Sequence, residues 1–289
     1  MASPRAFDLE LSPTIIEPAV RAALNEDLGL AGDVTTNSVI GPDVQAVGLF
    51  ATRKPGVVSG LKVAECAFRL LDPNVKFEIE HPDGTNAPGK SPLARVRGNA
   101  RALLSAERVA LNFVGRMAGI ATLTKQFVDA VKGTKAQIID TRKTTPNLRA
   151  FEKYAARCGG GMNHRVGLFD AVLIKDNHVI VAGGIGLAIE AVKSRVGHLV
   201  KVQCEVDTLD QLKEALNYKI DAVLLDNMTP EQMREAVKMC AGRVITEASG
   251  GVKLESVRAI AEAGVDLISS GALTHSVTVL DIGLDFEIG

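Results

Sequence analysis

The chain has 289 residues, of which 46% are hydrophobic and 23% are charged, the composition of a globular protein with enough apolar residues for a large core. Lys and Arg number 33 against 34 Asp and Glu, so the net charge is −1. That balance argues against nucleic acid or an anionic membrane as the main partner, because both require a basic surface. Any anion that the protein binds must be held by locally placed cations.

The four cysteines, Cys66, Cys158, Cys204 and Cys240, lie far apart in the chain. None forms a C-x-x-C pair, so the sequence indicates neither a zinc site nor a dithiol redox motif, and we expect reduced thiols. The first five residues contain no apolar signal core, and no run approaches the ~18 apolar residues that a membrane span requires. We therefore predict a cytoplasmic protein.

The first third of the chain predicts a small sheet domain with helices. Residues 12–27 form an amphipathic pattern with Pro13 near its start, which favours a helix ending at Gly29. Residues 33–36 are expected to form a loop or a helix cap. Between Val44 and Gly98, period-two alternation and pairs such as Asp83-Gly84 predict short strands separated by turns.

A long helix is predicted to begin at Ser105 and to end at Gly133, because apolar residues recur at spacings of three and four between them. Arg108 would lie in its first turn.

After Gly133 the pattern alternates between apolar runs and helical segments. The predicted strand cores are 137–139, 171–174, 200–204, 222–225, 244–246 and 266–268, and the predicted helices lie near 186–196, 209–217, 230–240 and 254–263. Near-continuous apolar runs at βαβ spacing indicate a parallel sheet covered on both faces. Six strands are fewer than the eight of a closed barrel, so we predict a partial or open β/α barrel, with a flat doubly wound sheet as the second choice. The tail from Ile282 alternates and is predicted to form a strand that returns to the first sheet.

Each predicted parallel strand leads into an ionic or glycine-rich sequence. These sequences are Asp140-Thr141-Arg142-Lys143, Lys175-Asp176-Asn177-His178, Glu205-Val206-Asp207, Asp226-Asn227, Glu247-Ala248-Ser249-Gly250-Gly251 and Ser269-Ser270-Gly271. Polar residues are common where strands leave a core, which explains one or two such ends but not all six. Since the carboxyl ends of parallel strands meet on one rim, we expect a single site there.

Three arginines are candidates for binding anions: Arg108, Arg142 and Arg165. A guanidinium matches a carboxylate or phosphate with two hydrogen bonds, so several arginines suit a substrate with several negative charges. Arg142 and Arg165 lie within the strand-end motifs, which favours function. For Arg108, which follows Glu107 on a helix, a solvated surface role is equally well supported.

Two lysines at strand ends, Lys143 and Lys175, have two interpretations. A desolvated lysine can form a Schiff base, whereas a protonated lysine stabilises a polyanion or a leaving group. Neither His164 nor His178 belongs to a zinc-binding motif. We assign His164 to substrate binding, because it adjoins Arg165, and His178 to bracing its loop.

Two carboxylates at neighbouring strand ends, Glu205 and Asp226, suit Mg²⁺ in combination with substrate phosphates. For Asp207 and Asn227 we prefer a structural role as helix N-caps, since helices are predicted just after both.

Two glycine-containing loops, Ser249-Gly250-Gly251 and Ser270-Gly271, each precede a predicted helix. Glycine lets the backbone approach a ligand, and free N–H groups at a helix start bind anions. Their position after the last strands matches the phosphate site of barrel enzymes.

These motifs together resemble the quinolinate phosphoribosyltransferase family, also called nicotinate-nucleotide pyrophosphorylase (carboxylating). The resemblance extends from Asn25 to Asp281. It rests on 107–112, 140–146, 159–165, 173–179, 205–207, 224–228, 247–251 and 271–274.

The resemblance implies that quinolinate and phosphoribosyl pyrophosphate give nicotinate mononucleotide, pyrophosphate and CO₂ in NAD biosynthesis, with Mg²⁺. It implies an N-terminal α/β sandwich domain, which we place at 1–114 with the tail 275–289 packed on it, and an open α/β barrel at 115–274. It also implies a cytoplasmic homodimer in which Arg108 enters the active site of the partner.

The resemblance assigns roles to the candidate residues. Lys143 with Mg²⁺ would neutralise the leaving pyrophosphate, while Glu205 and Asp226 would hold the metal and the ribose. The two glycine-containing loops would take the 5′-phosphate. The residues implied in binding the carboxylates of quinolinate are Arg108, Arg142, His164, Arg165 and Lys175, and Thr144 is implied as a further substrate-binding residue.

Three rival functions remain open at this point. One is a Schiff-base aldolase that uses Lys143 or Lys175. The second is a homologue associated with molybdenum transport, and the third is a salvage transferase that uses nicotinate.

Overall fold

The computed structural model describes residues 10–287, and the chain divides into two compact units. The first unit contains the residues up to Lys125, Pro146–Gly160 and the residues from Val277. The second contains Gln126–Thr145 and Gly161–Ser276. The first five residues, in which we expected no signal segment, and Ile288 of the predicted terminal strand lie outside the described residues.

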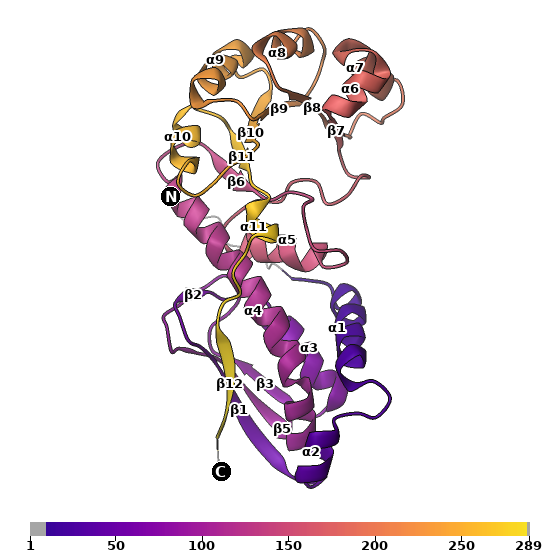
Figure 1. The fold of residues 1–289 in the computed structure, drawn as a ribbon, viewed down its shortest axis with the longest axis vertical. Coiled ribbons are helices and arrows are strands. Elements are labelled where there is room, and N and C mark those ends of the chain that lie inside the picture. The colour runs from indigo at the N-terminus through magenta and orange to yellow at the C-terminus, as the bar shows by residue number, and fades with distance from the viewer. Residues whose placement is uncertain (1–9, 288–289) are drawn as a thin grey trace. The chain divides into compact units, whose positions relative to one another are not determined.

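The first unit is built on an antiparallel sheet of four strands in the order β12-β1-β5-β3. Helices α1, α3 and α4 lie beside this sheet (Figure 1). The elements are α1 (Pro13–Leu28), α2 (Val34–Val39), β1 (Gln45–Thr52), β2 (Gly56–Val57), α3 (Leu61–Leu71), β3 (Lys76–Ile79), β4 (Asn86–Ala87), β5 (Pro92–Asn99), α4 (Ala100–Ala130), α5 (Arg149–Cys158) and β12 (Ile282–Glu287).

The core of this unit forms because each element buries one apolar face. The predicted stripe of α1 is confirmed, since Ile16, Val20 and Leu24 are all buried. The rings of Phe50 in β1 and Phe68 in α3 meet edge to face, with centroids 5.8 Å apart. Such contacts add to the burial of apolar surface, which is the main source of stability.

The long helix α4 begins at Ala100, five residues before the predicted start at Ser105. The reason is local capping, because the side-chain Oδ1 of Asn99 accepts hydrogen bonds from the backbone N–H groups of Arg101 and Ala102. Strand β5 therefore runs directly into the helix. The predicted place of Arg108 in the first turn is wrong, and its exposed side chain lies further along α4.

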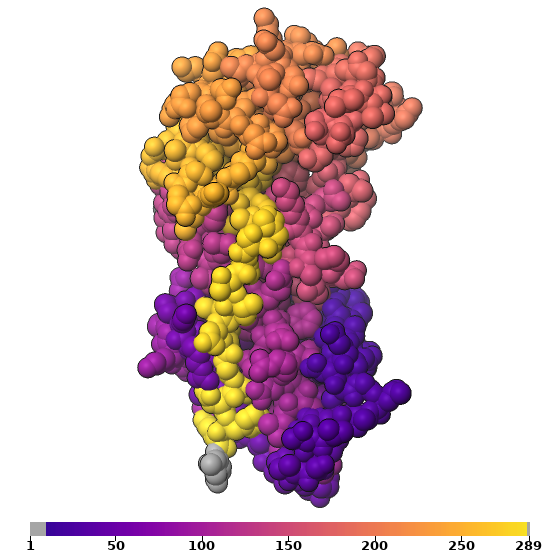
Figure 2. Space-filling model, viewed as in Figure 1, coloured from indigo at the N-terminus to yellow at the C-terminus, as the bar shows by residue number. Residues whose placement is uncertain are grey.

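The terminal strand β12 pairs with β1 in antiparallel register, with Leu284 opposite Phe50. Leu284 is buried, and the next strand residue, Asp285, is exposed and forms an ion pair with Arg53. The strand lies on the surface of its unit, where it is drawn in yellow (Figure 2).

The second unit is built on a parallel sheet of six strands in the order β6-β11-β10-β9-β8-β7. Strands β6 and β7 are its two edges, so the predicted open β/α arrangement is confirmed, and helices α7 to α10 lie along the outside of the strands (Figure 1). The elements are β6 (Gln137–Ile139), β7 (Val172–Ile174), α6 (Asp176–Ala182), α7 (Ile185–Lys193), β8 (Val202–Val206), α8 (Leu209–Ala215), β9 (Ala222–Asp226), α9 (Pro230–Cys240), β10 (Ile245–Ser249), α10 (Val257–Glu262), β11 (Leu267–Ser269) and α11 (Ala272–His275).

Three helices were absent from the expectation. Residues 33–36, expected to form a loop or a cap, contain the start of α2, with Asp33 as the N-cap that accepts from the Thr36 N–H at 2.9 Å. Helix α5 turns Phe151 and Ala155 into the core of the first unit. Helix α6 starts within the second strand-end motif, where the Lys175 N–H donates to Nδ1 of His178 at 2.9 Å. His178 thus braces its own turn, in agreement with the role predicted for it.

The predicted N-cap roles of Asp207 and Asn227 are wrong. The caps are Thr208 and Thr229, whose hydroxyls accept from the backbone N–H groups of the residues three positions later.

The four cysteines are free, as expected. Within residues 10–287, no helix is both long enough and apolar enough to cross a membrane.

Candidate functional site

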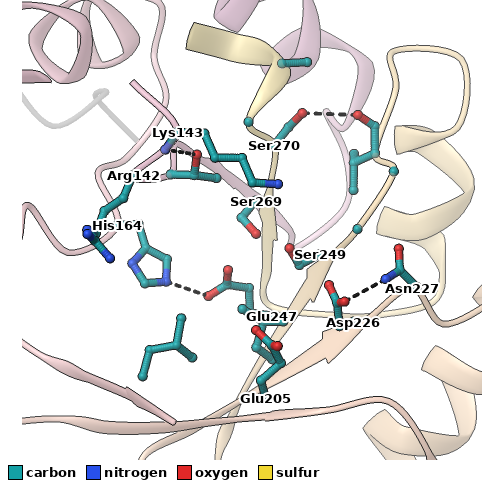
Figure 3. A pocket seen from close by; sticks show the side chains of 18 of the residues that line it. Arg142, Lys143, His164, Glu205, Asp226, Asn227, Glu247, Ser249, Ser269 and Ser270 are labelled. Carbon is teal, nitrogen blue, oxygen red and sulfur yellow. Dashed lines mark hydrogen bonds and ion pairs between the residues drawn. The ribbon is translucent and has the colours of Figure 1, made fainter. Parts of the chain in front are cut away.

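A cavity of about 560 Å³ lies at the carboxyl ends of the parallel strands in the second unit (Figure 3). This is the rim at which parallel β/α folds build their sites. The lining residues are Thr141, Arg142, Lys143, His164, Arg165, Leu173, Lys175, Glu205, Leu224, Asp226, Asn227, Glu247, Ser249, Gly250, Gly251, Val252, Ser269, Ser270, Gly271, Ala272 and His275.

The structure brings together twelve of the fourteen site residues predicted from the sequence. These are Arg142, Lys143, His164, Arg165, Lys175, Glu205, Asp226, Ser249, Gly250, Gly251, Ser270 and Gly271. Thr144 is not among the lining residues, and its hydroxyl lies 3.5 Å from the carbonyl oxygen of Arg142. Arg108 belongs to the first unit and does not line this cavity.

One side of the cavity carries two guanidinium groups, those of Arg142 and Arg165. The Nε of Arg142 is buried and has no hydrogen-bond partner among the described residues. Burial, and then the positive charge of Arg142, lower the pKa of Arg165. Two cations that repel each other, one with an unused buried donor, favour the binding of an anion between them.

The backbone of Lys143 is fixed at both of its polar groups. Its N–H donates to the Thr141 hydroxyl at 3.0 Å, and its carbonyl oxygen accepts from the Thr274 hydroxyl at 2.8 Å. A Cβ on Gly271 would lie 2.8 Å from the Lys143 side-chain Cδ, so glycine leaves room for the lysine stem. The exposed lysine is thereby directed along the cavity wall.

Lys175 is paired with a carboxylate, because its Nζ lies 2.9 Å from Oε2 of Glu205. Glu205 is buried in β8, whereas the lysine side chain is 48% exposed. The ion pair occupies the Lys175 amino group, which disfavours its use as a Schiff-base nucleophile.

The two predicted metal ligands, Glu205 and Asp226, come from the neighbouring strands β8 and β9. Burial, and then the negative charges of Glu205 and Asp207, raise the pKa of Asp226. Asn227 donates to Oδ2 of Asp226 at 2.7 Å (Figure 3). No cluster of three or more His, Cys, Asp or Glu side chains that could hold a metal occurs within the described residues.

The two glycine-containing loops meet across the cavity. The Ser270 hydroxyl donates to the carbonyl oxygen of Val252 at 3.1 Å, which joins the loop after β11 to the loop after β10. Gly250 has φ +87°, and a Cβ there would clash with Asn227. Glycine is therefore required for the close approach of the backbone.

The loop after β10 does not open a helix, contrary to the prediction, because α10 begins only at Val257. In contrast, α11 follows Gly271 directly, as predicted. The first loop must therefore offer its own backbone N–H groups to an anion, and not those of a helix start.

Sequence reasoning assigned no role to several residues of the site. Asp140 is fully buried below the cavity, and its carboxylate accepts from the Asn163 side chain at 2.6 Å and from the His164 N–H at 2.9 Å. Glu247 is buried in β10 and faces His164. Both were visible as strand-end acids, but only the fold shows which groups they hold.

Comparison with known proteins gave consistent matches over both units. The family model described as "Quinolinate phosphoribosyl transferase, N-terminal domain" matches residues 33–118, and the corresponding C-terminal domain model matches residues 120–285. The nicotinate-nucleotide pyrophosphorylase (carboxylating) of Mycobacterium leprae (strain TN) is 45% identical over 273 residues, which cover 92% of this chain and 95% of that protein.

A mitochondrial quinolinate phosphoribosyltransferase (decarboxylating) of Nicotiana tabacum is 40% identical over 306 residues, covering 98% of this chain and 87% of that protein. Among solved structures, the nicotinate-nucleotide pyrophosphorylase from Francisella tularensis superposes with a TM-score of 0.92 at 37% identity. The superposition covers 96% of this chain and 98% of that one.

Proposed function

The chain belongs to the quinolinate phosphoribosyltransferase family, and from this membership and the cavity we propose that it transfers the phosphoribosyl group of phosphoribosyl pyrophosphate to quinolinate. The products are nicotinate mononucleotide, pyrophosphate and CO₂, and the reaction is a step of NAD biosynthesis. One observation carries the proposal: a single cavity contains a cationic side, a pair of carboxylates and two glycine-containing loops.

The cationic side suits the two adjacent carboxylates of quinolinate. The guanidinium of Arg165 and the unused Nε of Arg142 can bind one carboxylate group together. Together with Lys175, which also lines the cavity, they would hold the pyridine ring so that its nitrogen points to the ribose.

The loops suit the phosphate groups of the second substrate. Gly250 and Gly251 both adopt positive φ, and Ser249 and Ser270 supply hydroxyls beside them. Successive backbone N–H groups in such a conformation form a concave anion site. We assign the 5′-phosphate of the ribose to this place.

The proposed chemistry needs positioning and charge more than an acid or a base. The quinolinate nitrogen bonds to C1 of the ribose as the C1–O bond breaks, and pyrophosphate leaves with the electron pair. Lys143, whose backbone is fixed, offsets the charge of the leaving group. The new pyridinium ring then accepts the electrons of the bond to the 2-carboxylate, CO₂ leaves, and the ring carbon takes a proton from solvent.

We also propose that Glu205 and Asp226 hold Mg²⁺. Their donor set fits this ion, since Mg²⁺ is usually held by one or two carboxylates together with substrate phosphates. The raised pKa of Asp226 supports the assignment, because it reflects burial and then the nearby negative charges of Glu205 and Asp207, which a cation would offset. When bound, the ion would supply positive charge to the pyrophosphate.

A homodimer with a shared site is part of the proposal. Arg108 is exposed on α4, and we propose that it reaches the site of the partner subunit and contacts a quinolinate carboxylate. We propose a cytoplasmic location, which the four free cysteines support because reduced thiols are typical of reducing compartments.

One assay tests the function. The purified protein is supplied with Mg²⁺ and phosphoribosyl pyrophosphate and with either quinolinate or nicotinate, and mononucleotide and CO₂ are measured. We expect turnover with quinolinate and stoichiometric CO₂. Turnover with nicotinate alone would support the salvage transferase, and a folded protein that turns over neither substrate would contradict the proposal.

The aldolase alternative has a separate test. Borohydride reduction in the presence of carbonyl substrates should leave Lys143 and Lys175 unmodified in a mass spectrum. A trapped adduct on either lysine would favour the aldolase.

A further inference from the structure

Both ring nitrogens of His164 are engaged by the protein itself. The backbone N–H of Arg165 donates to Nδ1 of His164, and the N···N distance is 2.7 Å. A backbone N–H can only donate, so Nδ1 carries no proton. The other nitrogen, Nε2, lies 3.4 Å from Oε2 of Glu247 and directs its N–H at this carboxylate (Figure 3).

These contacts assign the donor and the acceptor of the ring. Because the Arg165 N–H points at Nδ1, this nitrogen is the acceptor, and Nε2, which faces Glu247, is the donor.

The carboxylate that accepts this proton is held rigidly. Glu247 is only 1% exposed, and it lies in β10, which pairs on both sides with parallel strands. Its Oε2 also accepts from Nε2 of Gln203 at 2.7 Å. Burial alone raises the pKa of Glu247, but the hydrogen bond and charge interaction with His164, followed by the hydrogen bond from Gln203, outweigh it and lower the pKa.

We infer that Glu247 is a positioning residue: it fixes His164 with its proton on Nε2, and His164 in turn fixes the backbone of Arg165. Asp140 completes this hydrogen-bond network, since its carboxylate accepts from the backbone N–H of His164 at 2.9 Å. The segment that carries Arg165 is thus anchored at the backbone by one buried acid and through an imidazole by another. Second-layer carboxylates that orient a histidine act similarly in metal sites.

This assignment changes the role of His164 from the one implied by the resemblance. With both nitrogens occupied, His164 has no free donor for a substrate carboxylate, and the anion meets Arg165 instead. The inference rests on the proposed function only for the identity of that anion.

The first experiment measures the tautomer directly. Nitrogen chemical shifts of the histidine rings are recorded by NMR on the ¹⁵N-labelled full chain, and His164→Gln assigns the signal. We expect an unprotonated Nδ1 and a protonated Nε2 at about pH 7.5. An imidazolium, or a proton on Nδ1, in the wild-type protein would overturn the inference. This measurement needs no turnover, so it stands even if quinolinate is not the substrate.

The second experiment removes the carboxylate. Glu247→Ala should mix the tautomers of His164 and raise the KM for quinolinate roughly tenfold or more, with the KM for phosphoribosyl pyrophosphate unchanged. Glu247→Gln keeps an acceptor, so it should retain the Nε2–H tautomer and most of the affinity.

A matched control is Asp266→Asn, which changes another strand-associated acid that is bonded to Thr246 and Lys135 and does not line the cavity. It should leave the His164 signals and the KM for quinolinate unchanged. Equal losses of kcat in Glu247→Gln and Glu247→Ala, without a change of tautomer, would place the carboxylate in the chemistry and overturn the positioning role. The Gln variant and the wild-type spectrum decide the matter if the Ala variant does not fold.

Discussion

At the scale of single residues, the acid limit of activity belongs to Asp226. Burial, and then Glu205 and Asp207, raise its pKa, so the carboxyl group stays protonated to a higher pH than an ordinary aspartate. Because the proposed Mg²⁺ would bind the ionised form, kcat/KM should fall as the pH decreases through this raised pKa. Asp207→Asn removes one repelling charge and should move the acid limb to lower pH.

The check is the pH profile of kcat/KM at saturating Mg²⁺ for the wild type, for Asp207→Asn and for Asp210→Asn. Asp210 is the second residue of α8, and it is not among the charges that raise the pKa of Asp226. The Asp210 variant should keep the wild-type profile. An unchanged limb in Asp207→Asn would show that Asp226 does not set it.

The guanidinium groups give a second prediction at this scale. In Arg142→Lys the charge is kept, but the Nε–H donor is lost, so the hydrogen bond from Nε to the quinolinate carboxylate cannot form. A charge-assisted hydrogen bond contributes about 1.5–3 kcal/mol, which corresponds to a rise in the KM for quinolinate of roughly 10- to 100-fold. Arg157→Lys, at an exposed position of α5, is the matched control and should not change KM. A normal KM in Arg142→Lys would argue against a hydrogen bond from the Arg142 Nε to the carboxylate.

At the scale of elements, the loop after β10 depends on a positive φ at Gly250, a conformation that favours glycine. Gly250→Ala would meet two penalties, a residue with φ +87° and a Cβ 2.7 Å from the backbone nitrogen of Asn227. The conformation alone costs about 1–3 kcal/mol. We expect a lower melting temperature and a raised KM for phosphoribosyl pyrophosphate.

Gly133→Ala separates the two penalties. Gly133 has φ +82°, a Cβ added there would meet nothing within 4 Å, and the residue does not line the cavity. Calorimetry should show a comparable conformational cost, while both KM values stay at the wild-type level. If Gly250→Ala also kept its KM for phosphoribosyl pyrophosphate, this loop would not bind the phosphate.

The elements also show what the sequence could predict. The six parallel strands follow from apolar runs, and ten site residues follow from the polar sequences after them, while His164 and Arg165 come from the segment between the first two strands. Helix α6 could not be predicted from the sequence. Its first turn, which is capped through His178, consists of residues that also suit the polar end of a strand. The contact between Glu247 and His164 could not be predicted either. The two residues are 83 positions apart in the chain, and they come together only through the order of the strands in the sheet.

At the scale of the whole molecule, the open question is whether one chain completes its own site. The cavity in the second unit has cations for quinolinate, but Arg108 is not among the residues that line it. Arg108 is exposed, so loss of its side chain should not unfold the protein. A shared site then predicts that Arg108→Ala and Arg142→Ala, each inactive alone, complement one another.

In a mixed dimer, the barrel with intact Arg142 receives intact Arg108 from its partner, while the other site carries both changes. Random exchange gives half mixed dimers with one complete site each, so about a quarter of the wild-type activity should return. The two variants are unfolded, mixed and refolded, and activity is followed against the mixing ratio, with a maximum expected near equal amounts. Arg142→Ala mixed with Arg165→Ala is the control, because both changes lie in the same cavity wall and no complete site can form. Equal recovery in both mixtures, or none in the first, would mean that Arg108 serves its own subunit or no site at all.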